Sequence, residues 1–187
     1  MKVLGIFGSP RKGGNSDLLL EKALEGARSA GAEVTSLRAA DLDMSGCREC
    51  GGCDDTGECI VDDDMQKVYP ELDKADSIIL STPIFFYAPP AQLKAVIDRA
   101  QARWNRRRLS KKTKHESGTG YLIAVGATKG KNLFTGTELI AKYFFDALDM
   151  SYGGSIQFSS VDAKGAIKNH PDALDQAFRL GQRAGTP

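Results

Sequence analysis

Short apolar runs that alternate with helical stretches constrain the fold of this chain more than any other feature of its sequence. The runs expected to be strands cover residues 1–7, 33–38, 77–81, 121–125 and 155–158. Helices are expected over residues 17–30, 64–74, 90–105, 133–148 and 171–183. Because the strands are almost continuously apolar, both of their faces must be covered, as in a parallel sheet between two layers of helices.

This order of elements predicts an α/β protein with a flavodoxin-like, doubly wound sheet of five parallel strands in three layers. A chain of 187 residues has the usual size of one domain, so we expect a single domain over residues 1–187. A cysteine-rich insertion, residues 44–64, is expected after the second strand. Ligands of such folds bind at the carboxyl ends of the strands. The loops after the first, third and fourth strands are therefore the expected binding loops.

The charge balance excludes some classes of partner. The chain has 25 Lys and Arg against 24 Asp and Glu, a net charge of +1, so no overall field would attract nucleic acid or an anionic membrane. Its longest apolar stretches, residues 3–7 and 83–90, are far shorter than the ~20 residues that cross a bilayer. The first of them is also too short for a signal peptide. We expect a cytoplasmic protein with no membrane or nucleic-acid partner.

The loop after the first strand has the composition of a phosphate cradle. Small residues let backbone amides converge at a helix N-terminus, which favours an anion. The residues expected to bind phosphate are Ser9, Arg11, Gly13, Asn15 and Ser16. The loop does not match the G-x-x-x-x-G-K-[ST] motif, because Gly14 stands where that motif has its lysine. The alternative is an ordinary turn in which Asn15 or Ser16 caps the helix.

The loop after the third strand is apolar and aromatic where exposed loops are usually polar. Such a loop suggests a planar ligand resting on backbone and aromatic rings. The residues expected to contact it are Pro83, Ile84, Phe85, Phe86 and Tyr87, with Gly126 and Thr128 from the loop after the fourth strand as weaker candidates. A dimer contact or a plug of the core is the alternative for the aromatic loop. Phosphate and planar sites together fit flavin mononucleotide (FMN).

These motifs resemble those of the NADPH-dependent FMN reductase superfamily. The resemblance covers about the first 130 residues and rests on Gly8-Ser9-Pro10-Arg11 through Asn15-Ser16, on residues 82–86 and on Lys94-x-x-x-Asp98-Arg99. It implies a flavodoxin-like dimer. It also implies that the FMN phosphate lies on residues 9–16 and the isoalloxazine ring against residues 83–87.

Four cysteines lie close together as C-x2-C-x2-C-x5-C: Cys47, Cys50, Cys53 and Cys59. In a reducing compartment such clustering favours metal binding or catalysis over disulfides. Three thiolates spaced in this way wrap a short turn and can each reach one corner of a [4Fe-4S] cubane, and a fourth binds the last iron. Tetrahedral zinc is an alternative, although zinc sites usually pair two separated C-x2-C units. A metal-free segment is the other alternative.

The cysteine spacing narrows the resemblance to the iron–sulfur flavoproteins. That resemblance implies a [4Fe-4S] cluster beside FMN, electron transfer between them, and a small acceptor such as dioxygen, peroxide or a quinone. Ferredoxin or NAD(P)H is then the implied donor, and a dimer or tetramer the implied assembly. Flavin chemistry needs no acidic or nucleophilic side chain, so no catalytic residue is expected. The only histidines, His115 and His170, are expected at the surface.

Two other functions stay open at this point. One is an NAD(P)H-dependent FMN or quinone reductase in which the cysteines are structural. The other is a pure electron carrier, which is disfavoured because carriers of this fold tend to be strongly acidic and this chain is nearly neutral.

Two charge runs complete the pattern. Residues 54–64 hold six acids, and residues 103–114 hold seven bases. Each alone could be solvated surface. Because the acidic run surrounds the cysteines, we expect the basic run of a second subunit to pair with it and to bring one subunit's cluster near its neighbour's FMN.

Overall fold

The computed structural model describes residues 1–110 and 118–187 and contains one parallel sheet of five strands. The strands are β1 (Lys2–Phe7), β2 (Glu33–Arg38), β3 (Ser77–Pro83), β4 (Gly118–Val125) and β5 (Met150–Phe158). Their order across the sheet is β2-β1-β3-β4-β5, and every neighbouring pair is parallel. This is the doubly wound, flavodoxin-like order, which confirms the predicted fold class.

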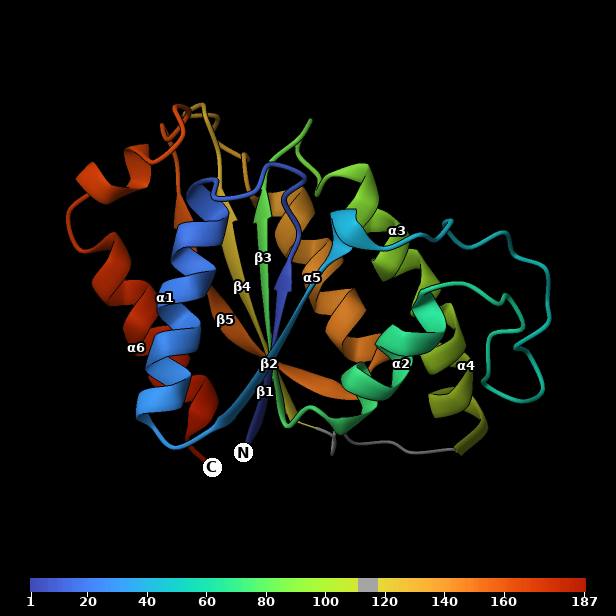
Figure 1. The fold of residues 1–187 in the computed structure, drawn as a ribbon. Coiled ribbons are helices and arrows are strands. Elements are labelled where there is room, and N and C mark those ends of the chain that lie inside the picture. The colour runs from blue at the N-terminus through green and yellow to red at the C-terminus, as the bar shows by residue number, and fades with distance from the viewer. Residues whose placement is uncertain (111–117) are drawn as a thin grey trace.

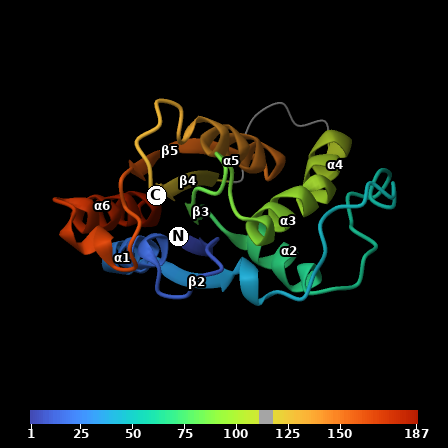
Figure 2. The same cartoon turned by 90° about the horizontal axis from the view of Figure 1, so that it is seen from above.

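Helices cover both faces of the sheet (Figures 1 and 2). The helices are α1 (Asn15–Ser29), α2 (Met65–Lys74), α3 (Ala91–Arg99), α4 (Gln101–Ser110), α5 (Thr135–Ala147) and α6 (Ala173–Gly185), with short 3-10 helices at Ala39–Asp41 (η1) and Ala166–Asn169 (η2). One face packs against α1 and α6, and the other against α2, α3 and α5.

The alternation of side chains along the strands divides the core into two parts. In β3, Ile78 and Leu80 point into the core beneath α2, α3 and α5, whereas Ile79 points into the core beneath α1 and α6. All three side chains are fully buried. A strand buried on both faces has no polar side, which is why these strands are continuous apolar runs in the sequence.

One predicted helix is divided in two. The expected helix over residues 90–105 separates at Ala100 into α3 and α4, and α4 continues to Ser110. The junction is a tightened turn, in which the Ala100 N–H donates to the Ile97 carbonyl and the Arg103 N–H donates to the Ala100 carbonyl. In these bonds an N–H donates to the carbonyl three residues earlier, as in a 3-10 helix, and not four residues earlier, as in an α-helix. Such a turn needs neither Pro nor Gly, so the sequence pattern does not reveal the break.

The cysteine segment, residues 44–64, lies between η1 and α2 and forms neither helix nor strand. Figure 1 shows it as a long excursion to the far side of α3 and α4. Glycine makes the close approach to α4 possible at Gly57, where a Cβ would lie 2.6 Å from the Arg106 Cα. Gly57 also has a φ of +70°, which glycine adopts without strain.

Among the helices of the described residues, none is long and apolar enough to cross a membrane.

Candidate functional site

The loops after β1, β3, β4 and β5 meet at the carboxyl edge of the sheet (Figure 1). In the first of them, the Arg11 N–H donates to Ser9 Oγ over 3.1 Å, and the Gly14 N–H donates to the Arg11 carbonyl over 3.2 Å. Gly13 has a φ of +67°. These bonds fold the loop into a tight turn immediately before the N-terminus of α1, where backbone N–H groups favour an anion.

The Asn15 side chain has a different use from the one predicted. Its Nδ2 donates to the Ala163 carbonyl over 2.9 Å, and its Oδ1 accepts from the Ile167 N–H over 3.2 Å. The amide therefore ties the loop after β5 to the start of α1. Lys164 lies in this tied loop, and a Cβ placed on Gly13 would lie 3.4 Å from its Nζ. The structure thus adds a cation to the edge of the predicted phosphate loop.

A buried carboxylate braces the same loop from behind. Asp17 is 1% exposed; its Oδ2 accepts from the Gly13 N–H over 2.9 Å and from Arg38 over 2.8 Å. Arg38 also donates to the Ser9 carbonyl over 3.1 Å. The Asp17–Arg38 pair joins both ends of the predicted phosphate loop to β2.

The aromatic loop after β3 ends in a strained two-residue turn. Phe85 and Ala88 exchange both of their backbone hydrogen bonds, at 2.8 and 3.0 Å. Between them, Phe86 has a φ of 51° and Tyr87 a φ of 64°, as in a type I′ turn. Left-handed backbone costs side chains other than glycine about 1–2 kcal/mol per residue. Strain of this kind concentrates at functional sites, and here it holds two aromatic rings in solvent at the mouth of the sheet.

Helix α5 contacts this turn, and the loops after β4 and β5 are joined to each other. Thr137 Oγ1, in the first turn of α5, donates to the Tyr87 carbonyl over 3.2 Å. The Gly126 carbonyl accepts from the Val161 N–H, and the Thr128 carbonyl from the Ser160 N–H. The predicted residues of the first, third and fourth loops therefore lie on one connected edge.

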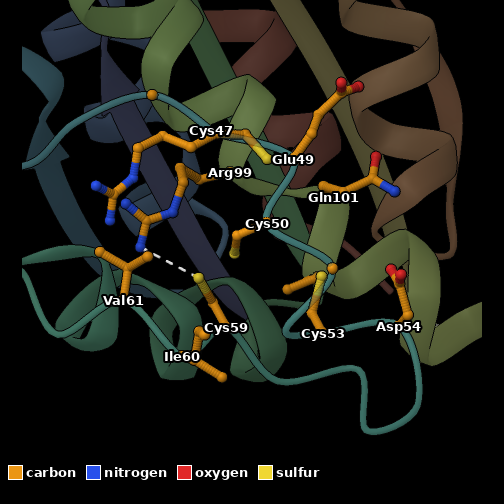
Figure 3. Close-up of a pocket in the computed structure, with 14 residues that line it drawn as sticks. Cys47, Glu49, Cys50, Cys53, Asp54, Cys59, Ile60, Val61, Arg99 and Gln101 are labelled. Atoms are coloured by element: carbon orange, nitrogen blue, oxygen red, sulfur yellow. Dashed lines mark hydrogen bonds between the residues drawn. The ribbon is translucent and has the colours of Figure 1, made fainter.

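The cysteine segment forms a second site, on the far side of α3 and α4. All four cysteines are free thiols, and all four line one cavity of about 210 Å³ (Figure 3). Arg99, Gln101 and Ala102, at the end of α3 and the start of α4, complete its wall. The spacing in the sequence thus translates into a shared cavity.

The thiols do not form a preassembled metal site. Within residues 1–110 and 118–187, no group of three or more His, Cys, Asp or Glu side chains is arranged to hold a metal ion. That the four cysteines together bind a metal or a cluster therefore stays a prediction.

Arg99 fixes one side of the cavity. Its side chain is 2% exposed and forms a two-pronged pair with Asp63, at 2.6 and 3.0 Å. The same guanidinium donates to the Ser45 carbonyl over 3.0 Å and to Cys59 Sγ over 3.4 Å. Burial opposes ionisation of Cys59, yet its pKa lies below the ordinary value because the Val61 backbone, Tyr69 and the charge of Arg99 favour the thiolate.

Asn105 fixes the other side. It is 1% exposed on α4, and its Nδ2 donates to Cys53 Sγ over 3.2 Å and to Asp54 Oδ1 over 3.0 Å. Two helix residues therefore donate N–H groups to two of the four sulfur atoms.

The expectation that the two charge runs pair across a subunit interface was wrong in its geometry. Within one chain, Arg103 and Arg106 both contact Glu58 of the acidic run and Asp73 of α2. Arg108 donates to the Asp54 carbonyl over 3.2 Å. The cysteine segment reaches these side chains because it folds back over α4, which the sequence pattern did not reveal. Lys111, Lys112, Lys114 and His115 lie outside the described residues.

Comparison with known proteins bears on both sites. A sequence model of the NADPH-dependent FMN reductase family matches residues 1–164. The chain belongs to the NADPH-dependent FMN reductase family. Membership places it among FMN-dependent oxidoreductases and confirms the resemblance drawn from the loops.

Two relatives of this reductase carry the name iron-sulfur flavoprotein. One, from Methanosarcina thermophila, is 41% identical over 100 residues, which are 54% of this chain and 52% of that protein. The other, from Methanocaldococcus jannaschii, is 31% identical over 192 residues, covering 98% of this chain and 95% of that protein. The first match thus spans about half the length of its relative. A solved structure described as a flavone reductase superposes with a TM-score of 0.74 at 21% identity, over 99% of this chain and 62% of that one, and so supports the fold.

Sequence reasoning missed several residues of the reductase's two sites. Asp17, Arg38 and Lys164 border the first loop, and Asn105 contacts a cysteine. Lys164 follows β5 at the carboxyl edge, so the rule that ligands gather there could have found it. Asn105 is the last residue of the helix expected over residues 90–105 and is followed by three arginines, and no local pattern distinguishes it.

Proposed function

We propose that this FMN-dependent oxidoreductase exchanges electrons between FMN at the carboxyl edge of the sheet and a [4Fe-4S] cluster held by Cys47, Cys50, Cys53 and Cys59. One observation carries the proposal: four free thiols line a single cavity in a chain of an FMN reductase family. Two relatives of this chain are named iron-sulfur flavoprotein, which supports the same conclusion.

The first loop is the proposed phosphate site. Ser9, Arg11, Gly13 and Ser16 offer hydroxyl, guanidinium and backbone donors beside the N-terminus of α1. Asn15 takes part through its backbone N–H, because its side chain holds residues 163 and 167. A carboxylate this close would repel phosphate, but Asp17 is paired with Arg38.

The aromatic turn is the proposed ring site. Pro83, Ile84, Phe85, Phe86 and Tyr87 would contact the isoalloxazine, with Gly126 and Thr128 on the neighbouring loop. The backbone of the turn is fixed before the ligand binds, so little ordering entropy is lost on binding.

The cysteine cavity fits a cluster by the chemistry of its donors. Its four sulfur ligands are what iron–sulfur clusters require. Arg99 and Asn105 place N–H groups against two sulfurs, and Cys59 has a lowered pKa, so the chain favours thiolate at the site. A bound cluster supplies one-electron steps, which FMN can join to two-electron chemistry.

The remaining parts of the proposal concern partners. A small redox acceptor, with NAD(P)H or ferredoxin as electron source, fits a proposed ring site whose Phe86 and Tyr87 side chains are exposed to solvent. We propose a homo-oligomer, a dimer or a tetramer, in the cytoplasm, and a single domain over residues 1–187. No side chain is proposed as a catalytic acid, base or nucleophile.

Replacing one ligand tests the proposal. Cys50→Ala should lose iron and acid-labile sulfide while keeping FMN, because the flavin loops lie on other elements. Asp55→Asn, an exposed change in the same segment, serves as the matched control and should keep all three. Iron and sulfide retained in Cys50→Ala would contradict the assignment of this ligand set.

A reductase without a cluster is the second candidate, and a relative from Bacillus subtilis favours it: that protein is named a putative NAD(P)H-dependent FMN-containing oxidoreductase and is 30% identical over 98% of both chains. The two candidates differ in colour. A protein with a cluster is brown, with broad absorption beneath the flavin bands. A yellow protein that NADPH bleaches, with no iron, would instead establish the cluster-free reductase.

A further inference from the structure

Asn105 is a buried asparagine in the middle of a helix, which is an unusual place for this residue type. Asparagine is a poor helix former, because its side chain competes for backbone hydrogen bonds. Here it lies in the middle of α4 and is 1% exposed. A buried amide that is left unpaired is costly, so its two contacts define its role.

Both contacts of the Asn105 amide nitrogen are to hydrogen-bond acceptors. Nδ2 donates to Cys53 Sγ over 3.2 Å and to Asp54 Oδ1 over 3.0 Å. A carboxylate accepts but does not donate, so the amide must turn its NH₂ group, and not its oxygen, toward Asp54. Asp54 therefore fixes the orientation in which the second N–H faces the sulfur.

Arg99 repeats this arrangement across the cavity. Asp63 holds the guanidinium with two hydrogen bonds, and a further N–H of Arg99 lies 3.4 Å from Cys59 Sγ. In both cases an aspartate of the cysteine segment holds a donor from the α3–α4 helices that also contacts a cysteine sulfur. Figure 3 shows Arg99, Cys53, Cys59 and Asp54 around the same cavity.

We infer that Asn105 and Arg99 are positioning residues that raise the reduction potential of the cluster by donating N–H groups to the sulfurs of Cys53 and Cys59. The inference rests on the proposed function. Adding one electron makes a cluster more negative, and N–H donors to its sulfurs stabilise that more negative state. Outer hydrogen bonds also orient the ligands themselves. Asp54 and Asp63 keep the donors in place.

The test is the midpoint potential of the Asn105→Leu holoprotein, measured by EPR-monitored redox titration. Leucine has a similar size and no N–H group, so iron and sulfide stay bound while one donor is lost. At a fixed poise, the ratio of reduced to oxidised cluster should fall by on the order of tenfold, which is about 59 mV for a one-electron couple. Should Asn105→Leu fail to fold, Asn105→Ala carries the same prediction without the added branch.

Gln101→Leu is the matched control. Gln101 is on the same helix and lines the same cavity, and the change again replaces an amide by leucine. No hydrogen bond from Gln101 to a sulfur is found among the described residues. The midpoint potential of the cluster in Gln101→Leu should therefore stay at the wild-type value. Arg99 is the less suitable target, because its loss leaves the half-buried Asp63 without its cation.

The possible results separate this inference from the proposed function. A full complement of iron with a wild-type potential in the Asn105 variant overturns the inference and leaves the cluster in place. An equal fall of the midpoint potential in the Gln101 variant also overturns the inference, because any substitution in the cavity would then lower the potential. Wild-type protein without iron overturns the proposed function, and the inference with it.

Discussion

A few buried side chains connect the cysteine segment to the body of the protein. Arg99 is the clearest, because it binds Asp63 with two hydrogen bonds and also reaches Ser45. Charge-assisted bonds of this kind are worth about 1.5–3 kcal/mol each, and a buried charge that loses its partner costs more. The segment therefore depends on a small number of contacts.

The Arg99–Asp63 pair gives the stability a defined pH dependence. Burial alone would raise the pKa of Asp63, but the hydrogen bonds from Arg99 and from the Met65 N–H hold it below the ordinary value. A lowered folded-state pKa contributes stability that is complete above the unfolded pKa and is lost as pH falls through the folded one. We expect Asp63→Asn to lower the free energy of unfolding of the metal-free protein by about 1.5–3 kcal/mol at pH 7.

That difference should shrink below about pH 4, where the Asp63 carboxyl of the unfolded chain begins to be protonated while the folded protein still holds it ionised. Urea titrations at several pH values measure it. Asp62→Asn, one residue earlier and exposed, should have little effect at any pH. A difference between Asp63→Asn and wild type that persists unchanged to pH 2 would show that the pair does not supply this stability.

Arg11 carries the main charge of the proposed phosphate site. Loss of one charge-assisted hydrogen bond to phosphate costs about 1.5–3 kcal/mol. Arg11→Ala should therefore weaken FMN binding by roughly 10–150-fold, as followed by flavin fluorescence. Unchanged affinity would remove Arg11 from the site. Arg28→Ala, in the last turn of α1 and away from the loop, is a suitable control.

At the residue scale, the sequence predicted the residues whose side-chain type and spacing point to one chemistry. Four cysteines at short spacing indicated a common site because few other uses need that pattern. The side chains that contact two of their sulfurs, Arg99 and Asn105, were not assigned this role, because hydrogen bonds over 40 and 52 residues of chain leave no local signal.

At the scale of elements, the binding edge follows from the order of strands. Parallel strands place their carboxyl ends together, so the loops after β1, β3 and β4 could be grouped from the sequence alone. The strained turn at Phe86 and Tyr87 could not, because nothing in an aromatic pair predicts left-handed backbone. Nor could the break between α3 and α4, which involves neither proline nor glycine.

The docking of the cysteine segment on α4 can be tested at one glycine. Gly57→Ala places a Cβ 2.5–2.6 Å from the Cα and Cβ of Arg106 and strains a backbone with a φ of +70°. The segment must then move off the helix, and we expect the protein to lose most of its iron. Iron and sulfide assays measure this.

Gly46→Ala is the control within the same segment, since a Cβ there would meet no atom within 4 Å. It should keep its iron. A Gly57→Ala protein with a full complement of iron would mean that contact with α4 is not needed to form the site.

At the scale of the whole molecule, the charge runs show how folding changes the meaning of a pattern. The sequence suggested that one subunit's bases meet another's acids. The structure instead pairs Arg103 and Arg106 with Glu58 and Asp73 of their own chain. A local pattern gives the sign and density of charge but not the path of a segment without helices or strands, so the partner could not be deduced.

The two sites occupy different sides of the helix layer. FMN is proposed at the carboxyl edge of the sheet, and the cluster beyond α3 and α4 (Figures 1 and 2). Helix α3 lies between the two sites in the sequence, since it begins just after the aromatic turn and ends at Arg99. One continuous stretch of chain thus connects the flavin loop to the cysteine cavity.

The central claim is that one chain carries both groups, and the composition of the purified protein tests it most directly. Wild-type protein prepared without oxygen should contain four iron atoms, four acid-labile sulfides and one FMN for each chain. Iron, sulfide, zinc and flavin would be determined on the same sample. Zinc in place of iron, or FMN with no metal at all, would contradict the claim.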